Sequence, residues 1–225
     1  MSTEVFGTPA VYAKKLRNEA LLSCVKYIAL MGVSLLSLYA YTVFDVKFSP
    51  LSLAPPLALF AYASYKFSSF KVKFAKANVG VRAEVRVSRA LVRCSPYAIV
   101  NGSMLGFHGD IDHIVVGPCL ATVETKHGVG KVSLDSAKKL VCGSKTFKGD
   151  PIEQALRAAS AVSKHSGFAC NAVLVVTDST TPPFKHAGVT VCSLKDLVSV
   201  LSSFPFVRVT EDAAVKLAIS LYKQS

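Results

Sequence analysis

Two long apolar runs near the start of the chain are followed by shorter runs with a different spacing. Residues 27–44 (YIALMGVSLLSLYAYTVF) carry no charge, and residues 48–65 (FSPLSLAPPLALFAYASY) form a second uncharged run. At about 1.5 Å per residue, a helix of either length measures roughly 27 Å, close to the hydrocarbon thickness of a bilayer. The pattern predicts two transmembrane helices. The second is the weaker one because it contains Pro50, Pro55 and Pro56.

The short connection between the runs predicts a tight helical hairpin. Two alternatives stay open. A signal peptide would have its apolar core nearer the start and no second span behind it. A buried helical hairpin in a soluble core would also accommodate the prolines.

From residue 80 onward the apolar runs are shorter and the period changes. Helical spacing predicts an amphipathic helix at 80–93, and Asp-Pro followed by a closing glycine predicts a second helix at 150–167. Ser and Thr caps predict closing helices at 193–204 and 210–224. Apolar runs bounded by turn residues predict strands at 97–100, 111–117, 120–126, 131–134, 171–177 and 189–192. This order predicts an α/β domain with a mixed central sheet flanked by helices.

Charge divides the chain in the same place. Residues 1–76 hold nine basic and three acidic side chains, whereas 77–225 hold 17 basic and 11 acidic ones. The basic residues of the first part flank the apolar runs, and the connecting loop holds only Lys47, offset by Asp45. By the positive-inside rule both termini are expected to face the cytoplasm. We therefore predict a multi-pass membrane anchor at 1–76 and a cytoplasmic domain at 77–225. Residues 65–77 mix Lys with Phe and form a basic juxtamembrane linker, either lying against anionic lipid or continuing the second helix.

The remaining composition narrows the function classes. The six cysteines are scattered without paired spacing, which argues against a structural zinc site and a disulfide framework and favours reduced thiols. The basic excess of 77–225 fits a nucleic-acid partner or a solvated basic surface.

The candidate chemistry lies on two adjacent predicted strands. Asp112 interrupts the run IDHIVV and Glu124 interrupts LATVETK, and a period of two places Lys126 on the same face as Glu124. A turn through Gly117 and Pro118 would bring Asp112 beside Glu124. Buried charges of this kind are costly unless they serve a purpose. Two carboxylates and a lysine suit Mg²⁺ (or Mn²⁺) and a water held for attack on phosphate. Glu-Thr-Lys alone is a common tripeptide and would also fit an exposed cross-strand charge pair.

Four motifs in order carry a family resemblance. GVRAE, DIDHIVVG, VETKHGVGKV and DPIEQA resemble the nuclease-related domain (NERD) family over roughly residues 78–180. The resemblance implies membership of the PD-(D/E)xK nuclease superfamily and a restriction-endonuclease-like sheet. It says nothing about the predicted membrane segments.

The resemblance also implies roles for individual residues. Asp112 and Glu124 would bind the metal, and Lys126 would activate water or contact phosphate. Glu84 would touch the metal through water or position the site, and Gln154 would orient it. Ala83 and Asp150 depart from the usual Gly and Asn of the family.

The two histidines beside these motifs are expected to differ. The period of two turns His113 away from the face of Asp112, which indicates a packing or hydrogen-bonding role. The role of His127 is left open.

Two functions follow. One is a membrane-anchored, divalent-metal-dependent nuclease that hydrolyses phosphodiester bonds, with DNA favoured over RNA. The alternative is a non-catalytic nuclease-like module that binds nucleic acid or a protein partner at the membrane. A homodimer is one option for the assembly, since cutting both strands would need a second cutting unit.

Overall fold

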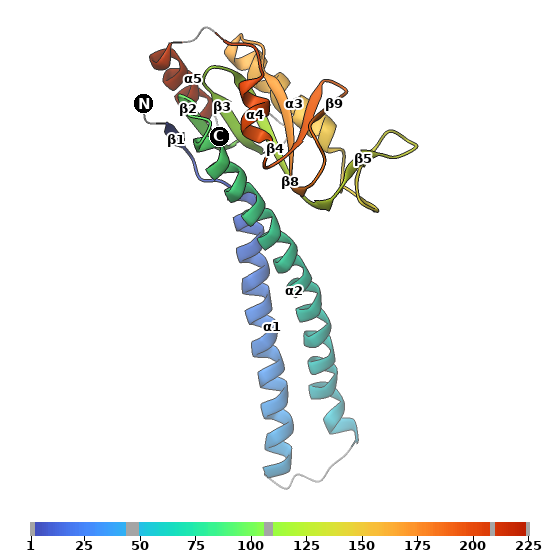
Figure 1. Cartoon of the computed structure of the whole chain (residues 1–225). Coiled ribbons are helices and arrows are strands. Elements are labelled where there is room, and N and C mark those ends of the chain that lie inside the picture. Colours follow the sequence, from blue (N-terminus) through green and yellow to red (C-terminus); the bar gives the residue numbers. More distant parts are fainter. Residues whose placement is uncertain (1–2, 44–49, 106–109, 208–209, 224–225) are drawn as a thin grey trace. The chain divides into compact units, whose positions relative to one another are not determined.

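In the computed structural model the chain forms two compact units, residues 13–79 and residues 1–12 with 80–225. The structure describes residues 3–43, 50–105, 110–207 and 210–223. Each unit is treated separately below, and Figure 1 gives the element labels.

The unit of residues 13–79 consists of parts of two long helices, α1 (Val11–Val43) and α2 (Pro50–Val92). Within it the helices lie antiparallel. The Ser64 hydroxyl lies 3.3 Å from the Met31 sulfur, and the Tyr27 ring contacts Tyr62 and Phe70 at centroid distances of 6.2 and 5.7 Å. The segment 65–77 is helical and continues the second apolar run. This confirms the expectation that the linker continues the second helix.

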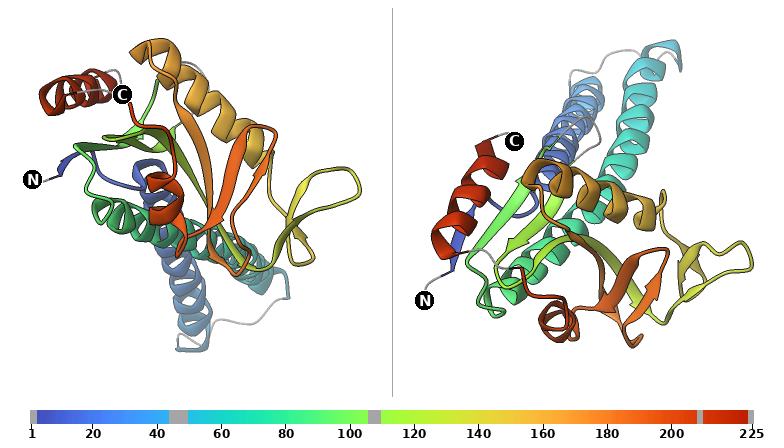
Figure 2. Two further views of the ribbon diagram at one scale, coloured as in Figure 1. Left: turned by 45° about the horizontal axis from the view of Figure 1, so that its top comes forward. Right: turned by 90° about the horizontal axis from the view of Figure 1, so that it is seen from above.

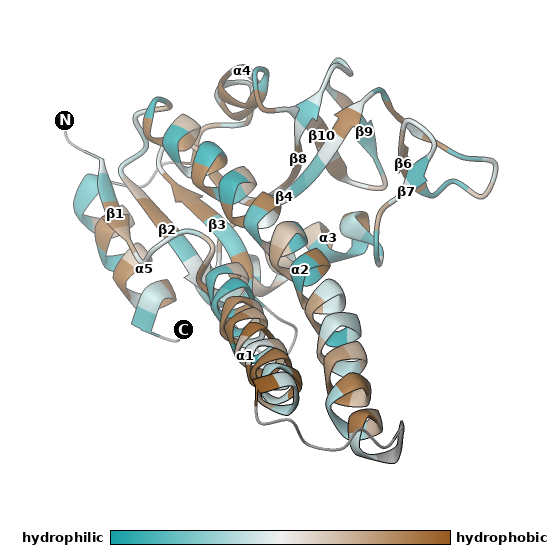
Figure 3. Cartoon of the chain, turned by 90° about the horizontal axis from the view of Figure 1, so that it is seen from below, coloured by the Kyte–Doolittle hydropathy of each residue, from teal (hydrophilic) through white to brown (hydrophobic). Residues whose placement is uncertain are grey.

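Only α1 among the described helices is long and apolar enough to cross a membrane. Its most apolar 18-residue window has a mean hydropathy of 1.9, and 6% of that window is buried, which is unlike the core helix of a soluble protein. Figure 3 shows hydrophobic residues along much of α1 and more frequent hydrophilic ones along α2. The prediction of a second span at 48–65 is not supported, because prolines and tyrosines lower the hydropathy of α2. Phe44, Phe48 and Ser49, at the ends of the predicted spans, lie outside the described residues.

The larger unit is built on a mixed seven-stranded sheet, as predicted for the α/β domain. Its strand order is β1-β2-β3-β4-β8-β10-β9. The β1–β2, β4–β8 and β8–β10 pairs are parallel, and the β2–β3, β3–β4 and β9–β10 pairs are antiparallel. The bounds are β1 Glu4–Phe6, β2 Ala98–Ser103, β3 Ile111–Val116, β4 Leu120–Gly130, β8 Asn171–Ser179, β9 Phe184–His186 and β10 Val189–Ser193. A small antiparallel sheet holds β5 Val132–Leu134, β6 Leu140–Cys142 and β7 Lys145–Thr146.

Helices cover both faces of the main sheet (Figure 2). The end of α2 and the short α4 (Leu197–Ser202) pack on one face through a core that includes Val87, Leu91 and Leu201. On the other face lie α3 (Pro151–Ser166) and α5 (Glu211–Lys223), which contribute Val162 and Leu221 to the core there.

Local chemistry explains where the helices of this unit begin and end. The Asp150 carboxylate accepts from the N–H groups of Ile152 and Glu153, and Gly167 ends α3 in the left-handed conformation, as its sequence predicts. Thr210 caps α5 by accepting from Ala213 N–H at 3.3 Å. The predicted Ser cap of the preceding helix is wrong. Ser193 is the last residue of β10, its hydroxyl bonds the Asp196 carboxylate at 2.6 Å, and α4 begins only at Leu197.

Candidate functional site

The β3–β4 hairpin positions the two predicted metal-binding carboxylates. The strands pair from Val116–Leu120 to His113–Val123, and the turn between them passes through Gly117. A Cβ atom at Gly117 would lie 3.0 Å from the Pro96 Cα atom, so this tight connection favours glycine. Beyond the last paired residues, the Asp112 carboxylate accepts from the Thr125 N–H at 2.7 Å. The hairpin therefore places Asp112 against β4 directly beside Glu124.

Glu124 and Lys126 lie on the same face of β4, as the period of two predicts. The Lys126 ammonium donates to the Glu124 carboxylate at an N–O distance of 2.6 Å. The Lys126 side chain is 24% exposed and the Glu124 side chain is 7% exposed. A glutamate this deeply buried requires a compensating charge, which Lys126 provides.

Three further carboxyl groups share the electrostatic environment of Glu124. Burial, reinforced by the negative charge of Glu124, raises the pKa of Asp112 well above its ordinary value and that of Asp110 to about 6. Burial and the charges of Asp110 and Glu124 raise the pKa of Glu84 to about 7, although the Ala10 N–H and Lys126 oppose this shift. Burial and the neighbouring carboxylates therefore favour the protonated form of these three carboxyl groups.

A small cavity of about 40 Å³ adjoins the cluster. Asp110 and Glu124 line it from the sheet, and Gln154 and Arg157 line it from α3. The cavity is large enough for an ordered water or a single ion. Gln154, predicted to orient the site, thus lies at the same cavity as Glu124.

Asp110 belongs to this site and Arg157 lines the cavity beside it, but neither was predicted. Asp110 precedes Asp112 by two residues, and that same-face spacing is the signal that would have identified it. Its Oδ1 atom is buried and finds no hydrogen-bond partner within the part of the chain that the structure describes. Arg157 follows Gln154 by one helical turn on α3, so it shares that face only once α3 has docked. We define the candidate site as Glu84, Asp110, Asp112, Glu124, Lys126 and Gln154.

The donors of this site suit a hard divalent cation, although no ligand set is preformed. Carboxylate oxygens are the ligands that Mg²⁺ prefers, and a bound cation would oppose the burial and the neighbouring negative charges that raise the three pKa values. In residues 3–43, 50–105, 110–207 and 210–223, no three His, Cys, Asp or Glu side chains converge closely enough to hold a metal. Asp112 and Glu124 thus remain predicted ligands.

His113 has the structural role that its position in the strand predicts. Its ring is fully buried, and the ring Nδ1 atom lies 2.7 Å from the Asn101 Oδ1 atom. Since an amide oxygen only accepts, Nδ1 carries the proton and the ring is neutral. Burial lowers the pKa of His113 to about 3, in keeping with that neutral state.

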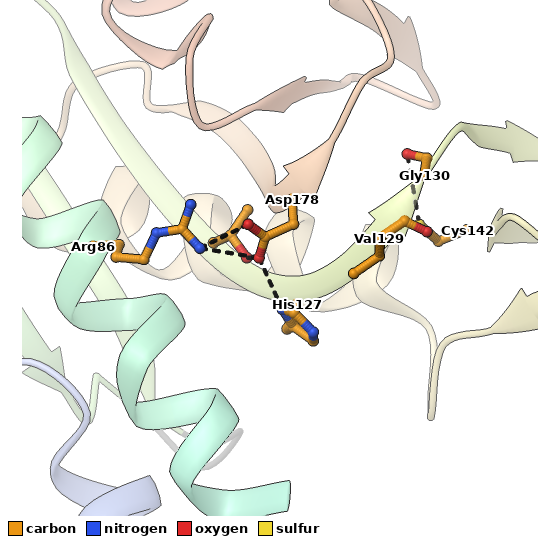
Figure 4. A network of polar contacts seen from close by, with 7 residues as sticks. Arg86, His127, Val129, Gly130, Cys142 and Asp178 are labelled. Atoms are coloured by element: carbon orange, nitrogen blue, oxygen red, sulfur yellow. Dashed lines mark hydrogen bonds and ion pairs between the residues drawn. The ribbon is translucent and has the colours of Figure 1, made fainter.

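His127 instead joins an exposed ion-pair network (Figure 4). Its Nδ1 atom lies 3.1 Å from the Asp178 carboxylate, which also accepts from Arg86 at 2.8 and 3.0 Å. The Arg86 guanidinium lowers the pKa of Asp178 below its ordinary value. This network lies where β4 and β8 continue past Lys126, since Val129 pairs with Asp178.

All six cysteines are free, as their spacing predicts. Burial raises the pKa of Cys119 to about 11 and the pKa values of Cys170 and Cys192 to about 12. These protonated thiols are unsuited to nucleophilic chemistry.

Comparison with known proteins confirms the family resemblance. Residues 79–178 match the model of the family described as the nuclease-related domain (NERD). The match spans every residue of the candidate site, from Glu84 to Gln154. No curated protein and no solved structure gives a significant match to the chain.

Proposed function

We propose that the chain, whose residues 79–178 match the nuclease-related domain family, is a membrane-anchored, divalent-metal-dependent nuclease. The supporting observation is the concentration of four carboxyl groups, those of Glu84, Asp110, Asp112 and Glu124, around one lysine at the same cluster. A purely structural role does not require four carboxyl groups to share a single compensating cation. DNA is proposed over RNA because restriction endonucleases, whose fold the resemblance implies, cut DNA.

Each side chain of the site has a separate proposed role in phosphodiester hydrolysis. Asp112 and Glu124 would hold Mg²⁺ or Mn²⁺, which when bound polarises the phosphate and lowers the pKa of a water. Lys126, released from Glu124 as that carboxylate turns to a cation, would orient the attacking water or balance charge developing on the phosphate. The Thr125 N–H fixes one Asp112 oxygen, and Gln154, which lines the cavity beside Glu124, would orient a water or substrate oxygen there through its amide.

The full chain, purified in a non-ionic detergent, provides the test. It is incubated with linear, circular and single-stranded DNA and with RNA, in the presence of Mg²⁺, Mn²⁺ or EDTA. We expect metal-dependent cutting that is lost in Asp112→Asn and Lys126→Ala. Asp212→Asn and Lys145→Ala are matched controls, since both residues are exposed outside the site. Cutting that survives the first two changes would point to a contaminating nuclease and contradict the proposal.

A second candidate is a non-catalytic module that binds nucleic acid or a protein partner at the membrane. The 2.6 Å Lys126–Glu124 ion pair favours it, because it engages two of the three proposed catalytic groups with each other. Binding without cutting under every metal condition, unchanged in Asp112→Asn and Lys126→Ala, would establish this alternative.

The anchor is proposed to contain two spans with both termini in the cytoplasm. Its support is the apolar helix α1, the antiparallel packing of α2 on it and the basic residues before and after the pair. Alkaline extraction should leave the chain in the membrane fraction, and release would contradict any span. Terminal tags distinguish the topologies. With two spans, protease removes both tags from the same side of sealed vesicles, whereas a single span places them on opposite sides.

A further inference from the structure

A basic groove of about 580 Å³ lies in the larger unit beside the end of α2. Four cationic side chains line it, together with residues at the end of β8: Arg86, Arg89, Arg93, Lys195, Asp178 and Ser179. We call these six residues the basic groove. All lie in the unit of residues 1–12 and 80–225.

Two of the three arginines lie on one face of α2, and the third follows the end of the helix. Arg86 and Arg89 are three residues apart on α2. Arg93 lies in the turn after Val92, where its N–H donates to the Ala90 carbonyl at 3.0 Å. Arg89, Arg93 and Lys195 are exposed, so the groove presents these cationic groups to solvent.

The groove carries unbalanced positive charge. Asp178 is its one acid, and it already pairs with Arg86 at 2.8 Å and with His127 at 3.1 Å. Within the described ranges, no carboxylate pairs with Arg89, Arg93 or Lys195. The Ser179 oxygen accepts from the Thr181 N–H at 3.0 Å, which leaves its own proton free to donate. An extended ligand with repeated negative charges fits such a surface.

Two elements connect the groove to the candidate site. Helix α2 carries Glu84 of the site, and Arg86, the first arginine of the groove, follows after two residues. Strand β4 carries Lys126 and then His127, whose ring contacts Asp178 in the groove (Figure 4). Because side chains two apart on a helix and one apart on a strand point in different directions, the groove and the carboxylate cluster lie on different sides of these shared elements. Only an extended anion would reach both, which favours a polymeric substrate over a small free anion.

We propose that the basic groove binds the phosphodiester backbone of the nucleic-acid strand next to the phosphate to be cut. Arg89 and Arg93 contact successive phosphates through their guanidinium forks, and Lys195 adds a third cation. The Asp178 carboxylate holds Arg86 in position within the groove. This assignment rests on the proposed function, because it names where that substrate lies.

Binding is measured apart from cutting. The full chain in non-ionic detergent is titrated into fluorescently labelled single-stranded and duplex DNA in EDTA, and anisotropy is followed from 50 to 200 mM salt. Loss of two phosphate contacts in Arg89→Gln/Arg93→Gln should weaken duplex binding about tenfold or more and reduce the slope of log K against log salt by about two. Arg89→Lys/Arg93→Lys should retain most of the slope, since the charges remain. Lys145→Gln/Lys216→Gln is the control, because it removes two exposed cations outside the groove.

Each outcome decides the assignment. Equal weakening in the groove variant and the control, or no DNA binding by the parent, would overturn it. Loss of binding to anionic phosphatidylglycerol vesicles in the groove variant, with DNA binding intact, would also overturn it and assign the groove to lipid headgroups. DNA binding that depends on the groove without metal-dependent cutting would support the groove while removing the catalytic function. Metal-dependent cutting by the parent that is unchanged in the groove variant would support the catalytic function and overturn the assignment of the groove.

Discussion

Two buried polar groups on the central strands have opposite character. On the α2 face, His113 and Asn101 form one short hydrogen bond between neutral side chains. Beside the face covered by α3, Glu124 shares its surroundings with Asp110, Asp112 and one lysine. Burial lowers the pKa of His113 and raises those of Asp110 and Asp112.

This difference distinguishes buried polar groups that stabilise the fold from those that serve a function. A neutral, paired group stabilises the fold that surrounds it, whereas neighbouring acids whose ionisation is opposed by burial and by one another cost stability when they ionise and persist for another reason. Buried polar residues alone are thus weak evidence for a site. Unbalanced charge is the stronger evidence, and the following predictions test whether the two groups divide in this way.

The largest expected effect is on catalysis. Glu124→Gln keeps the shape and the oxygen that Lys126 contacts, yet removes the charge proposed to hold the metal. We expect cleavage to fall about 100-fold or more, the range typical of removing one electrostatic or acid–base group. Because the change relieves repulsion among the acids, the unfolding temperature in EDTA should stay the same or rise. Cleavage within threefold of the parent, or a clear loss of stability, would place Glu124 with the structural group.

Asn101→Ala should have the opposite pair of effects, a lower stability and little change in cleavage. It leaves the buried His113 Nδ1–H without an acceptor, at a cost of about 2 kcal/mol in the free energy of unfolding. That corresponds to a fall of roughly 4–8 °C in the unfolding temperature of a domain this size. Cleavage below that temperature should stay within about threefold. Asn18→Ala, at an exposed position, is the control, and an equally stable Asn101→Ala would contradict the structural assignment.

Added divalent cation should stabilise through the acidic group alone. At a concentration tenfold above its dissociation constant, Mg²⁺ or Mn²⁺ should raise the free energy of unfolding by about 1.4 kcal/mol. The rise should disappear in Asp112→Asn and persist in Asn101→Ala. A rise that survives Asp112→Asn would show that the cation binds elsewhere on the chain.

Local patterns in the sequence predicted most of the sheet and its helices. Strand β8 is a continuous apolar run and α3 has an Asp-Pro start and a closing glycine, so both depend on neighbouring residues only. Strand β1 was missed because it spans three residues and pairs with β2, more than 90 positions along the chain. Prolines made the second span weak in the sequence, and it is the span that the structure does not support.

The candidate site divides in a similar way. Asp112, Glu124 and Lys126 stand out because charges interrupt apolar strands, and the hairpin register follows from the turn. Asp110 precedes its strand, where an acid is unremarkable, and Arg157 lies on the polar side of an amphipathic helix. The basic groove escaped notice because α2, β8 and the segment before α4 meet only after folding. Charge balance, unlike residue type, is a property of the packed molecule.

The smallest effect is on the pH dependence of stability, because the two groups oppose each other. Glu84 and Asp110 have folded pKa values of about 7 and 6, against ordinary values of 4.5 and 3.8. Between about pH 4 and 7 the folded chain binds protons there that the unfolded chain lacks, so their contribution to stability falls as pH rises. His113, with a pKa of about 3 against 6.5, is protonated only in the unfolded chain over most of this range, so its contribution falls as pH decreases.

In EDTA the parent should therefore show a shallow profile of stability against pH from pH 5 to 7. Asp110→Asn should lose stability more steeply on acidification, and His113→Gln, compared with itself across that range, should gain stability on acidification. The unfolding temperature at pH 5, 6 and 7 measures this, with Asp212→Asn, a change of an exposed acid on α5, as the control. Parallel profiles in all four proteins would mean that neither group titrates as its surroundings require.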